Sequence, residues 1–357
     1  MRSSSGVHFI ALDHVRALAA FLLFTWHFNH GPHGRPVPFN YAPAVFPLAL
    51  LDEGHTGVAL FMTLSGYLFA KLLDGKRISY GAFLCNRALR LLPLLALVVV
   101  IVGIQNILAG MTFGYYACAV AFGVLLPSLP NGGWSITAEF HYYLVLPLFL
   151  WMLKRSRLLP VSLVVVALAL RWLLHQSLGQ VQTAAYHTLF GRVDQFTLGM
   201  LGYHFRHLLA GRHLLAGFIL AGFGGFYWFF DAHGGFYNQP SYPSPSPVWI
   251  FLPTIEGLAY AGGIAWYDSS FSPPSTGVSR FIGLMGEYSY SIYLLHFFFV
   301  FRAARFVNEH IMSISNFYLA CVWSLLCFLL MMPIGYLSFR FIESPFLKLR
   351  RRYIVPG

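Results

Sequence analysis

The chain has 357 residues, of which 57% are hydrophobic and only 10% are charged. Soluble globular domains are about half apolar and about a quarter charged, so this composition excludes an ordinary soluble fold. The net charge of +11 does not indicate nucleic acid as a partner, because Lys and Arg gather in short stretches beside apolar runs, as they do in cytoplasmic loops.

Ten apolar runs are long enough to be transmembrane helices, which predicts an all-α polytopic membrane protein in contact with membrane lipids. They lie at about 9–30, 54–73, 84–108, 134–153, 158–176, 190–209, 214–231, 248–267, 281–301 and 316–340. These runs and their short loops leave no room for a separate soluble domain. We therefore expect one membrane-embedded domain over residues 1–357, with its core at 9–346 and a basic cytoplasmic tail at 347–357.

One further apolar piece, Tyr115–Leu126, is about half the length of a span and is followed by a run rich in Pro and Gly. This length is typical of a re-entrant or interfacial helix. If the piece does not cross, the basic stretches fall on one side of the membrane. Those stretches are Lys71–Arg77, Lys154–Arg157, Arg206–Arg212, Arg280 and Lys348–Arg352. The positive-inside rule then predicts ten spans in a cell (inner or plasma) membrane, with both termini cytoplasmic.

The first span, Ala11–His30, carries Arg16 and His27. Eleven helical steps separate the two residues, so they share a face about 16 Å apart along the axis. Ionisable groups at membrane depth cost about 2.5–3.5 kcal/mol each and usually face a bundle interior or a wet cavity. Imidazole is also the side chain most readily used as a general base near neutral pH. His27 is thus either a catalytic base or a histidine at a polar interface.

Arg87 and Arg90 are three residues apart at the predicted cytoplasmic end of the third span. Arginine pairs bind phosphates through paired hydrogen bonds, which indicates an anionic cytosolic ligand. Arginines that reach lipid headgroups would give the same pattern.

The fourth span opens with Trp134 and places Glu139 about one and a half turns inside, at a depth similar to that of His27. A carboxylate there could orient and stabilise a catalytic imidazole. A helix-capping role fits poorly, because a capping box needs the acid three residues after the cap rather than four after Ser135.

Two later spans carry further polar residues. Arg192 and Asp194 begin the sixth span and form either a structural ion pair or part of a substrate site. In the ninth span, Ser289, Tyr293 and His296 recur on one helical face. That stripe serves either helix–helix hydrogen bonding or the lining of a substrate tunnel.

In order along the chain, these stretches resemble the integral-membrane acyltransferase family 3, the bacterial O-acyltransferases. The matching pieces are Leu12-Asp13 with Arg16 and His27, Phe61–Tyr67, Arg87-x-x-Arg90-x-x-Pro93, Trp134–Glu139, Arg192-x-Asp194 with Gly199, Ser289–His296 and Phe341–Phe346. Each piece alone is weak, whereas seven in sequence over residues 11–346 is a strong signal. One departure is Phe140, where many relatives carry a second acid.

The resemblance implies transfer of an acyl group, usually acetyl, from cytosolic acyl-CoA to a hydroxyl of a saccharide or glycoconjugate. It implies that Arg16 and His27 match the family's Arg/Lys-to-His motif, and that Arg87 and Arg90 match its Arg-x-x-Arg motif. Our hypothesis is that acyl-CoA binds Arg87 and Arg90 and extends alongside Arg16 to His27, which Glu139 holds.

On this hypothesis Trp134, Tyr290 and Tyr293 line the acceptor end, and no metal takes part. The competing class is a non-enzymatic lipid or solute transporter, in which the same intramembrane charges mark a permeation route. A transporter would leave the thioester of acetyl-CoA intact.

Overall fold

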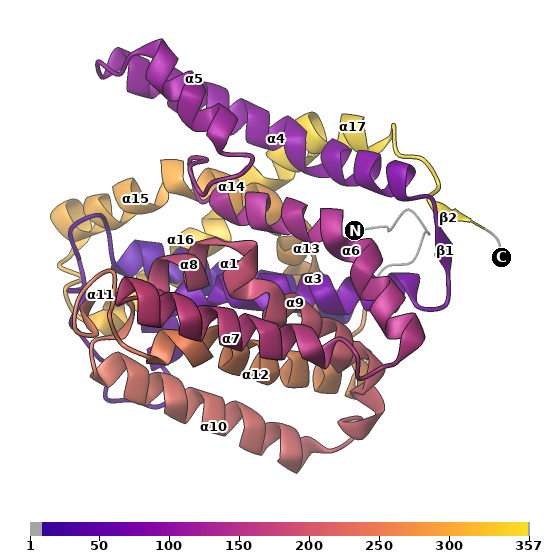
Figure 1. The fold of residues 1–357 in the computed structure, drawn as a ribbon. Helices are drawn as coiled ribbons and strands as arrows, with labels where there is room; N and C mark the ends of the chain where they lie inside the picture. Colours follow the sequence, from indigo (N-terminus) through magenta and orange to yellow (C-terminus); the bar gives the residue numbers. More distant parts are fainter. Residues whose placement is uncertain (1–8, 356–357) are drawn as a thin grey trace.

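The computed structural model describes residues 9–355 and is built almost entirely of helices (Figure 1). Its longer helices are α1 (Ile10–Asn29), α3 (Gly57–Leu73), α4 (Tyr80–Leu108), α6 (Trp134–Arg155), α7 (Val161–Leu178), α9 (Leu189–His204), α10 (His213–Ala232), α12 (Val248–Ser270) and α16 (Phe317–Ser338). The shorter ones are α2 (Ala49–Asp52), α5 (Phe113–Phe122), α8 (Gln182–His187), α11 (Gly235–Asn238), α13 (Gly277–Glu287), α14 (Ser289–Leu295), α15 (Val300–Phe306) and α17 (Ser344–Leu347).

Short turns of other geometry join several of these helices. The 3₁₀ turns lie at Gly54–Thr56, Arg206–Leu208 and His296–Phe298, and the π-helical turns lie at Val307–Ile311 and Phe339–Glu343. Two short strands, β1 (Arg77–Ile78) and β2 (Ile354–Val355), pair in antiparallel fashion. The predicted tail at 347–357 is thus described up to residue 355, and residues 1–8 and 356–357 lie outside the described residues.

Seven helices in the described part of the chain are long and apolar enough to cross a membrane, or eight if one bent helix pair forms a single span. The predicted all-α polytopic fold is therefore confirmed, but the count of ten spans is not. The predicted spans 9–30 and 190–209 correspond to α1 and α9, which are not among the seven. The predicted span 281–301 is interrupted, and the helices on either side of Phe299 are bent by 57°.

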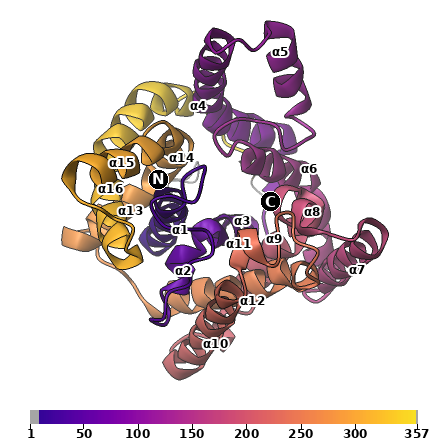
Figure 2. The same cartoon turned by 90° about the vertical axis from the view of Figure 1, so that its left-hand side faces the viewer.

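The position of α1 and α9 explains why they are less apolar than a lipid-facing span. Figure 2 shows α1, α3 and α9 inside a ring of other helices. In the most apolar stretch of α3, 78% of the residues are buried, against 28% for α4, α10 and α16. Helices screened from lipid in this way can carry polar side chains that contact other protein groups. In α1 Asp13 and Asn29 are buried, and in α9 Arg192 and Asp194 are buried.

Two glycines allow α3 and α9 to pack closely. A Cβ atom on Gly66 would lie 2.0 Å from the carbonyl oxygen of Phe196, and one on Gly199 would lie 1.9 Å from that of Thr63. Small residues at helix crossings let backbones approach, which is a main source of packing energy between membrane helices. Each helix of this pair therefore needs its glycine.

The interruption of the predicted span 281–301 has a local cause at His296. Its Nδ1 lies 2.5 Å from the carbonyl oxygen of Tyr293, and the helix changes there from α to a 3₁₀ turn. A side chain that bonds a backbone carbonyl competes with the regular helical hydrogen bond and bends the helix. The helix thus changes its geometry at the last residue of the polar stripe.

The short helix α5 folds back against α4. The Tyr116 hydroxyl donates to the carbonyl oxygen of Val99 at 2.6 Å, and α5 has 10 residues. A helix of that length rises about 15 Å and cannot cross a bilayer alone. This agrees with the prediction that Tyr115–Leu126 does not cross.

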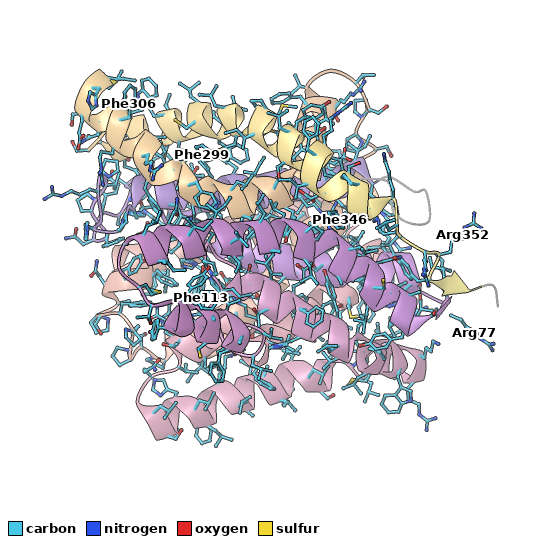
Figure 3. All side chains as sticks on the ribbon, turned by 90° about the horizontal axis from the view of Figure 1, so that it is seen from above. Arg77, Phe113, Phe299, Phe306, Phe346 and Arg352 are labelled. Atoms are coloured by element: carbon cyan, nitrogen blue, oxygen red, sulfur yellow. The ribbon has the colours of Figure 1, made fainter. Side chains whose placement is uncertain are left out.

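Several of the basic stretches gather at one end of the bundle. Asp74, Arg157 and Arg206 line one surface hollow there. Figure 3 shows Arg77 and Arg352 at the same end, whereas Phe113 and Phe306 lie toward the other. We refer to the two ends as the basic face and the opposite face. That the basic face is cytoplasmic stays a prediction.

Candidate active site

A cavity between α1, α3, α4, α6 and α14 contains the predicted arginines, and we call it the inner cavity. Its lining includes Arg16 from α1, Arg87 and Arg90 from α4 and Glu139 from α6, together with Tyr290 of α14. The remaining lining residues are Val58, Phe61, Met62, Leu64, Ser65, Leu68, Phe69, Leu91, Ser135, Ile136, Tyr143, Ser289 and Tyr293. The structure thus brings together charged groups from three helices that are far apart in the sequence.

The cationic groups of the inner cavity have different partners. Arg16 forms an ion pair with Asp13. The Arg87 guanidinium lies 5.4 Å from the ring centre of Phe69, and its buried Nε has no hydrogen-bond partner among the described residues. Arg90 lies 6.0 Å from the ring centre of Tyr290. A buried N–H without an acceptor costs free energy, so the Nε of Arg87 is a donor that could bond a ligand oxygen.

Glu139 does not hold His27, so that prediction is wrong. Its carboxylate accepts hydrogen bonds from the Ser65 hydroxyl at 3.1 Å and from the Tyr143 hydroxyl. Tyr143 follows Glu139 by four residues, a spacing that puts two side chains on one helical face, so this partner could have been found from the sequence. Ser65 comes from another helix and carried no such signal.

A second cavity lies around His27, and we call it the outer cavity. Its lining is largely aromatic and comprises Leu23, Trp26, His27, Val58, Gly132, Trp134, Tyr186, His187, Phe236, Tyr237, Tyr242, Tyr293 and Phe297. Tyr237 belongs to the short helix α11, and Tyr242 lies in the irregular segment between α11 and α12. His27 therefore faces a cavity rather than lipid.

The hydrogen bonds around His27 define which of its nitrogens carries the proton. His296 Nδ1 lies 2.5 Å from the Tyr293 carbonyl oxygen, which can only accept, so this nitrogen carries the proton of His296. His296 Nε2 is then an acceptor, 3.2 Å from His27 Nδ1, which also lies 2.9 Å from the carbonyl oxygen of Leu23. His27 Nδ1–H thus faces two acceptors, and the lone pair of His27 falls on Nε2. A neutral imidazole held in this tautomer is suited to act as a general base.

A thin wall separates the two cavities. Val58 and Tyr293 line both of them. The Tyr293 hydroxyl lies 2.8 Å from the hydroxyl of Ser135 and 2.8 Å from the carbonyl oxygen of Gly132. Gly132 has a φ of 72°, and a Cβ atom there would lie 2.6 Å from the Tyr293 hydroxyl oxygen. Only glycine fits this turn without displacing Tyr293.

Arg192 and Asp194 do not pair with each other, and neither lines the two cavities. Residues two apart on a helix point about 200° apart. Asp194 instead pairs with Arg171 of α7 at 2.7 Å, and Arg192 donates to the Gln195 side chain at 2.9 Å. The sequence interpretation missed Arg171, which is fully buried.

Arg192 does not line the outer cavity, but it contacts two of the aromatic residues that do. Its guanidinium lies 4.4 Å from the ring centre of Tyr186 and 5.6 Å from that of Trp134. The Trp134 ring lies 4.8 Å from that of His187. Burial, followed by the charge of Arg192, lowers the pKa of His187 to about 4, so this second imidazole of the outer cavity is neutral at physiological pH.

Within residues 9–355, no group of three or more His, Cys, Asp or Glu side chains could hold a metal ion. The fold and the two cavities define a polytopic helical membrane protein with a polar site inside its bundle. Residues 9–333 match the family model described as an acyltransferase domain. The chain therefore belongs to acyltransferase family 3 and is a membrane acyltransferase. Neither the curated proteins nor the solved structures compared with the chain gave a match.

Proposed function

We propose that this acyltransferase moves an acyl group, most simply acetyl, from acyl-CoA at the basic face to a hydroxyl of a saccharide or glycoconjugate. In this proposal the basic face is cytoplasmic and the protein lies in the cell inner membrane. The observation that carries the proposal is the pair of cavities that share Val58 and Tyr293. Arginines line one cavity and the candidate base His27 lines the other.

The inner cavity supports the choice of donor. Acyl-CoA carries phosphates, and Arg87 and Arg90 offer guanidinium groups near the basic face. From there the pantetheine arm extends past Arg16 toward His27, a rise of about 16 Å along α1. Tyr293 and Val58 stand where the thioester must meet the outer cavity.

The outer cavity supports the choice of acceptor. Trp26, Trp134, Tyr186, Tyr237 and Tyr242 give it flat apolar surfaces edged with polar tips. Aromatic rings can stack on the C–H faces of a sugar ring, while their polar atoms bond its hydroxyl groups. A free anion would find few partners among these side chains.

The chemistry then follows from the tautomer of His27. Its Nε2 takes the proton of the acceptor hydroxyl, and the oxygen attacks the thioester carbonyl carbon. The C–S bond breaks, the thiolate of CoA leaves, and the imidazolium returns the proton to that thiolate. His296 keeps the imidazole in the reactive tautomer throughout. Glu139, bonded to Ser65 and Tyr143, acts on the donor side rather than on His27.

The test is acyl transfer by the purified protein in proteoliposomes supplied with acetyl-CoA labelled in the acetyl group. Free CoA and labelled glycan should appear together, and cell glycans with and without the gene should differ by an acetyl mass. A transporter would move solute and leave the thioester intact, and that result would contradict the proposal.

A further inference from the structure

The C-terminal tail folds back onto the start of α4, beside the arginines of the inner cavity. The side chain of Asn86 donates to the carbonyl oxygen of Arg351 at 2.7 Å and accepts from its backbone N–H at 3.0 Å. Strand β2 pairs with β1, which comes just before α4 in the chain. Tyr353 is buried with its ring 5.5 Å from that of Phe83. The tail is therefore held in place by the fold.

This arrangement brings Arg350 close to Arg87 and Arg90. Arg350 directly precedes the residue that Asn86 holds, and Asn86 directly precedes Arg87. Burial, followed by the charges of Arg90 and Arg87, lowers the pKa of Arg350 to about 10. The guanidinium remains protonated at neutral pH and is repelled by its two neighbours.

Glu343 is the acidic neighbour of Arg90, but one carboxylate does not balance three guanidinium groups. A bound anion would compensate the remaining positive charge. The buried Nε of Arg87 lacks an acceptor among the described residues. Arginine clusters bind phosphate groups through paired, charge-assisted hydrogen bonds. The tail lies beyond residues 9–333, the segment that the family model matches.

We propose that Arg350 of the folded-back tail completes a phosphate-binding cradle with Arg87 and Arg90. The occupant is the phosphorylated adenosine end of the acyl-CoA donor, and in this respect the inference rests on the proposed function. The tail is then part of the donor site rather than a simple membrane anchor.

The experiment is a binding titration of the purified full-length protein in an uncharged detergent, with CoA, adenosine 3′,5′-bisphosphate and pantetheine as separate probes. Arg350→Gln should bind CoA and the bisphosphate about tenfold more weakly, the size of one lost charge-assisted hydrogen bond. Its affinity for pantetheine, which has no phosphate, should not change. Arg350→Lys should recover part of the loss, because the charge remains and the paired geometry does not.

Arg352→Gln is the matched control, because Arg352 is an exposed arginine of the same tail. Figure 3 shows its side chain pointing away from the bundle. Arg352→Gln removes the same charge as Arg350→Gln and should leave the affinities for all three probes unchanged. Thermal unfolding of each variant shows whether the tail variants fold equally well.

The other outcomes separate this inference from the proposed function. Equal CoA affinities in Arg350→Gln and wild type overturn the cradle, even where acyl transfer is intact. Bisphosphate binding that depends on Arg350 without any acyl transfer supports the cradle and contradicts the proposed function. If Arg350→Gln loses only binding to phosphatidylglycerol vesicles, the occupant is a lipid headgroup and the assignment to CoA is overturned.

Discussion

The two cavities are built from some of the same helices but offer opposite chemistry. Helix α1 contributes Arg16 to the inner cavity and His27 to the outer one, and α14 contributes Tyr290 to the inner and Tyr293 to both. The inner lining carries three arginines and a glutamate, whereas the outer lining has imidazole and aromatic rings. Under the proposed function, the cationic lining binds the anionic donor and the aromatic lining binds the neutral acceptor. The proposed function thus assigns two unlike substrates to two adjacent cavities of one bundle.

The largest effect should come from His27, which tests the outer cavity as the place of chemistry. His27→Ala should lower acyl transfer about a thousandfold, because a general base contributes about 10²–10⁴. CoA affinity should stay unchanged, since the donor's charges bind at the other cavity. Transfer rates and CoA titrations on the same preparation check both points.

His233→Ala is the control for this variant, because His233 is exposed beyond the end of α10. It should transfer at the wild-type rate. A His27→Ala protein that is folded and still transfers normally would remove this histidine from the mechanism. Weakened CoA binding in that protein would instead mean that donor binding is not confined to the inner cavity.

The inner cavity should respond in the reverse way. Arg87→Gln should raise KM for acetyl-CoA about thirtyfold, or about 2 kcal/mol, as expected when a charged hydrogen-bond donor is lost. The kcat at saturating donor should change little. Steady-state kinetics with varied acetyl-CoA measure both, and Arg302→Gln, an exposed arginine near the opposite face, should behave as wild type. A lower kcat at unchanged KM would contradict the division between the cavities.

A substitution at Tyr293, which lines both cavities, should have a smaller effect than those at His27 and Arg87. Tyr293→Phe keeps the ring that separates the cavities but removes the hydroxyl bonded to Ser135 and Gly132. We expect kcat to fall about tenfold, the cost of one hydrogen bond of about 1.4 kcal/mol, with little change in KM for either substrate. Tyr288→Phe, which alters a buried tyrosine outside both linings, is the control. A normal kcat in Tyr293→Phe would make this hydroxyl irrelevant to turnover.

Local geometry explains what could be predicted from the sequence. Arg16 and His27 lie eleven helical steps apart, so their shared stripe follows from the helix alone. The clustering of basic residues predicts Arg87 and the C-terminal tail on the same side of the membrane. The hydrogen bond between Asn86 and Arg351 is a closer contact than that rule predicts. The family resemblance, which rests on motifs in order, is confirmed over residues 9–333.

Choices of partner across helices could not be predicted. Asp194 pairs with Arg171 rather than with Arg192, and this depends on how α7 packs against α9. Glu139 contacts Ser65 instead of His27, because similar depth in a membrane does not place two side chains on facing surfaces. The span count also depended on neighbours, since α1 and α9 are surrounded by protein and need not be apolar.

The smallest effect concerns Glu53, which supports the wall of the outer cavity from the loop before α3. Its carboxylate accepts a hydrogen bond from the backbone N–H of Phe236 at 3.0 Å, and Phe236 lines that cavity. Burial, followed by the charge of Asp52, raises the pKa of Glu53 to about 8. The nearby charges of His30 and Glu256 act in opposite directions on the same group.

Because the folded-state pKa of Glu53 is above its ordinary value of 4.5, the folded protein holds this proton more tightly than the unfolded chain does. Its contribution to stability is then complete below about pH 4.5 and is lost as the pH rises through about 8. The thermal unfolding temperature should fall over this range, and Glu53→Gln should fall less, because the amide stays neutral. The exposed Glu309, changed to Gln, should leave the profile as in wild type. Since Glu53 supports only the outer cavity, KM for the acceptor should rise with pH in this range while KM for acetyl-CoA does not; a parallel rise of both would mean that the two cavities loosen together.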